Sequence, residues 1–157
     1  RWKVMLLPIV RIQICQICKK FLKNIKIVGQ NAFNNCNQLS FVDIPNCETL
    51  GDESFYNCGQ LQSLILKTVQ TVGSFAFAGC SKLSSIDFKL CETVGDAAFY
   101  ECSALQTVIL PNLKSIGAYA FKKCCELKII DLPKCETIKY GAFENCSVLS
   151  RINLASL

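Results

Sequence analysis

Residues 116–133, IGAYAFKKCCELKIIDLP, contain one complete copy of a pattern that fills most of the chain. Three of its residues, Phe121, Cys124 and Leu127, recur six times at intervals of 22 residues without an insertion or deletion. The three columns are Phe33, Phe55, Phe77, Phe99, Phe121 and Phe143; Cys36, Cys58, Cys80, Cys102, Cys124 and Cys146; and Leu39, Leu61, Leu83, Leu105, Leu127 and Leu149. A fixed period of this length indicates a repeat architecture.

The spacing of apolar residues within each copy predicts its local structure. Val42 and Ile44 flank Asp43, and this alternation is typical of a short, half-buried strand. Phe55 and Cys58 lie three residues apart, which favours a helical or 3₁₀ turn, and a glycine before them favours a tight corner. A unit of 22 residues cannot bury a core alone, so the phenylalanine and cysteine columns are expected to stack on those of neighbouring coils as structural residues.

The pattern Ile-Gly-x-x-Ala-Phe-x-x-Cys-x-x-Leu-x-x-Ile-x-Leu-Pro resembles the BspA-type leucine-rich repeats over about residues 22–157. The resemblance implies a right-handed leucine-rich-repeat solenoid of about six coils. Short parallel strands would form one face, with 3₁₀ or helical turns and loops on the other. This family is known for surface-exposed and secreted adhesion-type proteins of host-associated bacteria and for expansions in parasitic protists, so the resemblance implies protein binding rather than catalysis.

The domain organisation follows from length and composition. A chain of 157 residues with 51% hydrophobic content can bury a core as one domain. We expect residues 22–157 to form the solenoid, as a fragment of a longer repeat protein, and residues 1–21 to form a degenerate coil or partial N-terminal cap.

A longer period of 44 residues is superimposed on the 22-residue repeat. One column alternates between aspartate and isoleucine in successive copies: Asp43, Ile65, Asp87, Ile109 and Asp131. This alternation indicates that two coils were duplicated together.

Basic residues are concentrated at the start of the chain, where residues 1–28 carry seven Lys or Arg and no acid. Such a stretch contacts nucleic acid or an anionic membrane in some proteins, but a solvated chain end is the favoured interpretation. We therefore do not expect nucleic acid as a partner. The longest N-terminal apolar run, Val4 to Val10, is too short for a transmembrane span.

Twelve cysteines raise the question of disulfides or zinc. Six of them share one column and are expected to be reduced core residues, because side chains stacked in parallel do not readily reach disulfide geometry. Cys15 and Cys18 have the spacing of a zinc or redox pair, but there is no second pair and no histidine, so packing is favoured. Cys125 follows the column residue Cys124 and is the candidate reactive thiol.

The sequence contains few of the residue patterns that catalysis requires. The chain has no histidine, and its glycines occur singly rather than in a phosphate-binding loop. We expect no enzyme activity, no metal, no cofactor and no small-molecule substrate.

The outward side of the predicted sheet is the candidate site. Exposed isoleucines between acids are typical of protein-binding patches, although β-branched residues also favour strands wherever they lie. The candidate partner-binding residues are Phe41, Asp43, Ile65, Lys67, Asp87, Lys89, Ile109, Ile129 and Asp131. The two lysines could instead form cross-strand ion pairs with the acids.

The sequence therefore predicts a non-enzymatic interaction or adhesion module whose partner is a protein, such as a host or surface protein, or a glycan. The alternative is a structural spacer within a larger protein, and the weaker alternative is anionic membrane or nucleic-acid contact through the basic N-terminal stretch. The compartment stays open, because the family resemblance favours the cell surface or secretion and the unpaired cysteines favour the cytoplasm.

Overall fold

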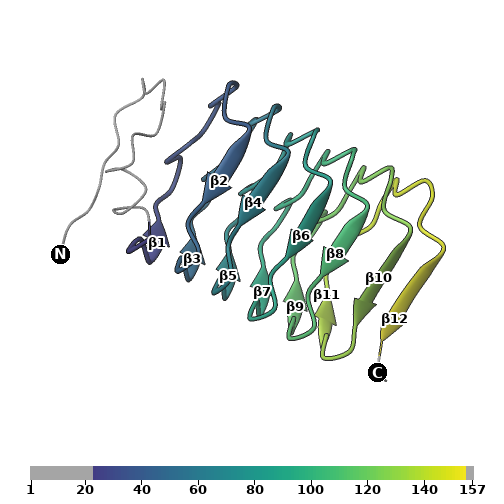
Figure 1. Ribbon diagram of the computed structural model, residues 1–157. Coiled ribbons are helices and arrows are strands. Elements are labelled where there is room, and N and C mark those ends of the chain that lie inside the picture. The colour runs from purple at the N-terminus through teal and green to yellow at the C-terminus, as the bar shows by residue number, and fades with distance from the viewer. Residues whose placement is uncertain (1–22, 155–157) are drawn as a thin grey trace.

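The computed structural model describes residues 23–154, which wind into a row of stacked coils with two parallel sheets running along its length (Figure 1). Each coil contributes one strand to each sheet, and no helix forms in this range. The solenoid expected from the repeats is confirmed. The expected N-terminal cap at residues 1–21, with its Cys15–Cys18 pair, lies outside the described residues.

The sheet with the longer strands, called here the wide sheet, contains the outward positions predicted from the sequence. Its strands are β2 (Phe41–Asp43), β4 (Ser63–Ile65), β6 (Ser85–Asp87), β8 (Thr107–Ile109), β10 (Ile129–Leu132) and β12 (Arg151–Leu154). Paired residues are 22 positions apart, as with Asp87 and Ile109, so the repeat period sets the register. Regular pairing is interrupted between β4 and β6, in the coil where Phe88 replaces an aliphatic residue, so the wide sheet consists of a two-stranded part, β2–β4, and a four-stranded part, β6–β8–β10–β12.

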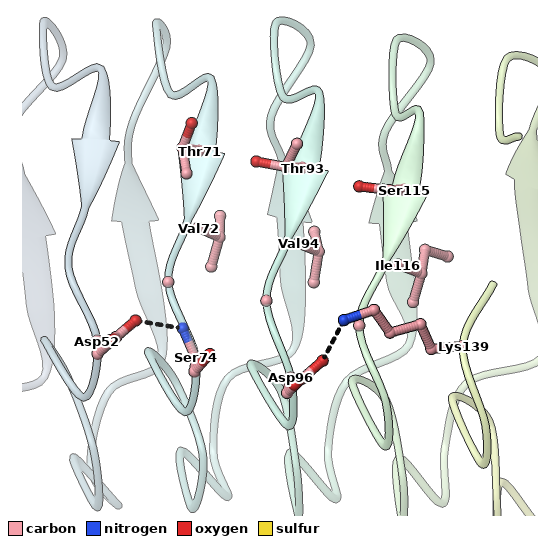
Figure 2. Close-up of a pocket in the computed structure, with 13 residues that line it drawn as sticks. Asp52, Thr71, Val72, Ser74, Thr93, Val94, Asp96, Ser115, Ile116 and Lys139 are labelled. Carbon is pink, nitrogen blue, oxygen red and sulfur yellow. Dashed lines mark hydrogen bonds and ion pairs between the residues drawn. The ribbon is translucent and has the colours of Figure 1, made fainter. Parts of the chain in front are cut away.

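The second sheet, called here the narrow sheet, is a continuous six-stranded ladder of two-residue strands. Its strands are β1 (Ile27–Val28), β3 (Thr49–Leu50), β5 (Thr71–Val72), β7 (Thr93–Val94), β9 (Ser115–Ile116) and β11 (Thr137–Ile138). Figure 2 shows Thr71, Thr93 and Ser115 side by side on successive strands. Each of these three residues precedes a buried aliphatic residue, so the sheet closes the core on its inner side.

The segment expected to form a helical or 3₁₀ turn differs from that expectation in its hydrogen bonding. The amides of Ser54 and Tyr56 donate to carbonyls three residues earlier in their own coil, those of Gly51 and Glu53, both at 3.2 Å. The amide of Phe55, which lies between them, donates at 2.7 Å to Ala76 of the next coil. Glu53 (φ 54°) and its equivalents in other coils have positive φ angles, and the amides of Glu53 and Phe55 both donate to the next coil. The segment therefore joins neighbouring coils, whereas a helix would satisfy its amides internally.

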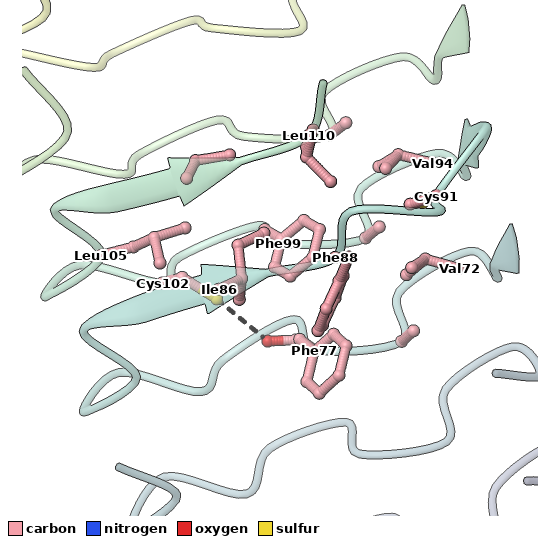
Figure 3. Close-up of a cluster of buried hydrophobic side chains, with 14 of the residues drawn as sticks. Val72, Phe77, Ile86, Phe88, Cys91, Val94, Phe99, Cys102, Leu105 and Leu110 are labelled. Atoms are coloured by element: carbon pink, nitrogen blue, oxygen red, sulfur yellow. Dashed lines mark hydrogen bonds between the residues drawn. The ribbon is translucent and has the colours of Figure 1, made fainter. Parts of the chain in front are cut away.

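The core is dominated by the six phenylalanines at 22-residue spacing, called here the phenylalanine ladder. Successive rings are stacked, with centroids 5.0–5.5 Å apart and interplanar angles of 2–8°. This spacing is close to the ~4.8 Å between neighbouring strands, so in-register coils impose it directly. Phe88 packs beside the ladder, with its ring tilted against Phe77 and Phe99 (Figure 3). Phe33 and Phe143 are only half-buried, whereas the four rings between them are fully buried.

The six cysteines at the same spacing form a second stack, called here the cysteine ladder. The thiol of Cys102 donates a hydrogen bond at 3.2 Å to the carbonyl of Phe77, 25 residues earlier (Figure 3). The same bond recurs from Cys58, Cys80, Cys124 and Cys146 at 3.0–3.2 Å. All ten cysteines in the described part of the chain are free thiols. Five of the six ladder thiols thus donate to a carbonyl of the preceding coil as well as filling space.

The glycine column is explained by the close approach of neighbouring coils. A Cβ on Gly95 would lie 2.6 Å from the backbone nitrogen of Ser74, and one on Gly117 would lie 2.4 Å from that of Asp96. Neither glycine has a positive φ. A side chain at this position would push the coils apart, so the requirement is steric rather than conformational.

Candidate interaction surface

The outward positions of the wide sheet form two parallel columns of side chains, all exposed except the half-buried Asp43. The first column contains Phe41, Ser63, Ser85, Thr107, Ile129 and Arg151, and the second contains Asp43, Ile65, Asp87, Ile109, Asp131 and Asn153. Large apolar groups are exposed in both columns, with exposed fractions of 46% for Phe41, 36% for Ile65, 40% for Ile109 and 47% for Ile129. This face therefore presents apolar contact area to solvent.

The second column alternates in charge from strand to strand. Asp87 pairs in register with Ile109, and Ile109 pairs in register with Asp131. With strands about 4.8 Å apart, successive aspartates are spaced by about 9.6 Å. Ile109 therefore lies between two carboxylates, and Ile65 pairs in register with Asp43, so this apolar surface is flanked by negative charge.

Few protein groups neutralise these carboxylates. Lys89 lies 3.6 Å from Asp87, two residues away in its own coil, and both side chains are well exposed. Asp131 accepts a hydrogen bond from the amide of Asn153. Among the described residues, Lys67 forms no ion pair with any acid. Lys89 thus pairs along its own chain rather than across strands, and such an exposed pair is easily exchanged for a partner's cation.

An open pocket of about 310 Å³ lies over the narrow sheet, above the glycine column (Figure 2). Its carboxylates already have partners: Asp52 accepts the backbone amide of Ser74 at 2.7 Å, and Asp96 accepts that of Ala118 at 2.8 Å. Lys139 replaces the glycine of the last copy, and its Nζ reaches back across two coils to Asp96 at 3.3 Å. The charged groups of this pocket therefore hold coils together and are less available to a ligand than those of the wide sheet.

Burial makes the ladder thiols chemically inert. Desolvation raises the pKa of Cys58 and of Cys91 to about 12, and it raises the pKa of Cys102 further because that residue is more deeply buried. A thiol with a raised pKa has almost no thiolate at neutral pH and is a poor nucleophile. Cys125 is only half-buried, and its thiol contacts the carbonyl of Lys123 at 3.4 Å.

The described residues hold no group of three or more side chains arranged to bind a metal ion. None of their elements is a helix long and apolar enough to cross a membrane.

The structure places seven of the nine predicted partner-binding residues on the strands of the wide sheet, with Phe41 and Ile129 in the first column, and Lys89 two residues beyond the end of β6. Lys67 lies beyond β4 without contacting an acid. The pocket over the narrow sheet was not predicted. Its signal was present, because Thr71, Thr93 and Ser115 recur at 22-residue spacing, but a two-residue strand shows too little alternation to be recognised.

The chain matches the family model described as BspA type Leucine rich repeat region, in six copies over residues 15–111 and 89–157. No curated protein sequence matches it.

Solved structures show the same fold. A leucine-rich repeat protein from T. pallidum matches with a TM-score of 0.72 and 26% identity, over 80% of this chain and 62% of that one. A leucine-rich repeat protein from Bacteroides ovatus gives 0.63 and 22%, over 84% and 47%. A leucine-rich cell surface protein from Faecalibacterium prausnitzii gives 0.56 and 24%, over 83% and 43%. The chain thus spans less than two thirds of each of these proteins.

The family match covers nearly all of the described solenoid, and the repeat columns, the parallel sheets and the similar structures agree with it. The chain therefore belongs to the BspA-type leucine-rich repeat family.

Proposed function

We propose that this chain is a non-enzymatic interaction module that captures a protein partner through the outward face of the wide sheet, in an adhesion-type role. The observation that carries the proposal is the alternation of Asp87, exposed Ile109 and Asp131 on adjacent strands. Apolar side chains supply contact area, and the flanking carboxylates supply specificity for a cationic or hydrogen-bonding partner.

Family membership supports an interaction role, because repeats of this kind build extended surfaces and place their reactive groups in the core. The similar F. prausnitzii structure is described as a cell surface protein, which supports an adhesion-type role at a surface. The raised pKa of the buried thiols, such as Cys58 and Cys91, also argues against a cysteine nucleophile in the core.

The test compares two triple variants that alter the same three coils, one on the wide sheet and one on the narrow sheet. The first, Ile65→Thr, Asp87→Asn and Ile109→Thr, changes the wide sheet and keeps β-branched residues at two of the three sites. The matched control, Thr71→Val, Thr93→Val and Ser115→Val, changes the outward positions of the narrow sheet. Both variants keep the buried residues, so both should fold like the wild type, as checked by circular dichroism.

A displayed library of folded domains and peptides and a glycan array are screened against all three proteins. We expect ligands that bind the wild type to be lost with the wide-sheet variant and retained with the narrow-sheet control. Retention by the wide-sheet variant, or no enriched ligand on the wild type, would refute the proposal, and the second result would favour a structural spacer.

A further inference from the structure

We propose that the wide sheet binds a single polypeptide segment in the polyproline II conformation that carries Lys or Arg at every third residue. This inference rests on the proposed function and names the partner class of the same face.

The spacing of the acidic side chains carries the inference. Asp43, Asp87 and Asp131 occupy one column on every second coil. Ile65 is in register with Asp43, and Ile109 is in register with both Asp87 and Asp131. Two strand spacings give about 9.6 Å between successive carboxylates along the solenoid axis, and four give about 19 Å from Asp43 to Asp131. A partner that lies along this axis needs cationic groups at the same interval on one side.

Polyproline II fits this interval better than the other regular backbones. It rises about 3.1 Å per residue with three residues per turn, so side chains three apart lie on one side at about 9.3 Å. An extended strand repeats its face every two residues, at roughly 6.8 Å. An α-helix brings residues i and i+7 to one stripe at about 10.5 Å. Over two intervals the mismatch is about 0.6 Å for polyproline II and about 1.8 Å for the helix.

The apolar and small side chains of the face suit the rest of such a segment. Ile65 and Ile109 are exposed between the acids, where they can contact proline rings and the methylene stems of the partner's lysines. Ser63, Ser85 and Thr107 form a row of short side chains beside them. A polyproline II segment is already extended and has no internal hydrogen bonds to break, so it loses little conformational entropy on docking.

The negative charge of the wide sheet also matches a cationic segment. The only cation paired with this column among the described residues is Lys89, whose exposed contact with Asp87 at 3.6 Å is weak enough to be replaced. Within β6, β8, β10 and β12 the backbone amides and carbonyls bond neighbouring strands, so the backbone around Asp87, Ile109 and Asp131 is not free to pair with a partner. Recognition therefore depends on side-chain spacing rather than on strand addition.

The test uses two synthetic nonapeptides of equal composition, PPKPPKPPK and PPKPKPKPP. Both are proline-rich, but only the first places its three lysines on one side, since no two lysines of the second are separated by a multiple of three residues. Affinity for the intact protein is measured by fluorescence anisotropy at low and at physiological salt. A third peptide, an alanine-rich helix with lysines at seven-residue intervals, represents the helical alternative.

We expect PPKPPKPPK to bind about fivefold more tightly than PPKPKPKPP. The second peptide should lose two of the three ion pairs with the aspartates, and each exposed pair is worth roughly 0.5 kcal/mol. The variant Asp87→Asn with Asp131→Asn should bind both peptides equally. The control Asp52→Asn with Asp96→Asn, on the narrow sheet, should keep the preference.

Equal binding of the two proline peptides to the wild type, or tighter binding of the helical peptide, would overturn the inference. If neither proline peptide binds while the library yields ligands that the wide-sheet variant loses, the inference fails and the proposed function stands. If the library also yields none, both fail.

Discussion

Raising the pH from 7 to 10 is expected to destabilise the protein strongly, because its buried thiols must stay protonated in the folded state. Cys58, Cys80, Cys91, Cys102 and Cys124 are fully buried. Burial raises the pKa of Cys58 and Cys91 from the ordinary thiol value of 9.0 to about 12, and it raises the pKa of the other three further. Between pH 9 and 12 the unfolded chain has therefore released protons that the folded chain still holds.

The sign and the magnitude follow from proton linkage. The folded state binds more protons, so the free energy of unfolding decreases as the pH rises above 9, by about 1.4 kcal/mol per pH unit for each thiol. At pH 10 each buried thiol lowers the free energy of unfolding by about 1.4 kcal/mol relative to pH 7, and the five together lower it by about 7 kcal/mol. This approaches the whole stability of a typical domain, about 5–15 kcal/mol. Below pH 9 the thiols are protonated in both states and contribute no pH dependence.

The measurement is urea unfolding followed by circular dichroism under a reducing agent at pH values from 7 to 10. The variant Cys80→Ala with Cys102→Ala is expected to be less stable at neutral pH. Because it lacks two of the five buried thiols, its unfolding free energy should decrease by about 2.8 kcal/mol less between pH 7 and 10 than that of the wild type. An unfolding free energy that stays constant to pH 10, or an identical loss in this variant, would refute the reasoning.

Three other substitutions or reactions test individual packing arguments. Gly95→Ala should lower the unfolding free energy by about 2 kcal/mol, because the added Cβ forces neighbouring coils apart. In the same denaturation assay Gly59→Ala should be neutral, because a Cβ there would lie 3.8 Å from its nearest neighbour, the Ser81 hydroxyl oxygen. Ser54→Ala should stabilise the fold by about 1 kcal/mol, because the buried Ser54 hydroxyl has no hydrogen-bond partner; a lower melting temperature would contradict this. Among the cysteines of residues 23–154, Cys125 should react first with a thiol reagent in the native protein, as located by peptide mass mapping, and faster labelling of ladder cysteines would show that the core opens.

Much of the fold could be predicted because each coil repeats the same inward positions. The columns of Phe121, Cys124 and Leu127 fixed the period, and Val42 and Ile44 indicated the wide-sheet strands. The narrow sheet could not be predicted, since strands such as Thr71–Val72 contain only one outward and one inward residue. The turn segment is expected from its sequence to be a helical or 3₁₀ turn, because three-residue spacing does not distinguish these from turns that donate alternately to the next coil.

The candidate surface was predictable to the same extent. Alternation placed Asp87 and Ile109 outward, and the structure pairs them on adjacent strands. Two ion pairs could not be predicted: the one between Lys89 and Asp87, and the one between Lys139 and Asp96, 43 residues earlier. Both depend on side-chain direction and coil spacing, which no local sequence pattern encodes.

Carboxylate footprinting with a bound ligand tests the assignment of the binding face most directly, because the chain has exposed aspartates on both sheets. A ligand from the library screen is bound, exposed carboxylates are coupled to an amine with a carbodiimide, and modification is measured by mass spectrometry with and without the ligand. The account predicts protection of Asp87 and Asp131 on the wide sheet and unchanged modification of Asp52 and Asp96 on the narrow sheet. Protection of Asp52 and Asp96, with Asp87 and Asp131 modified as in the free protein, would contradict it.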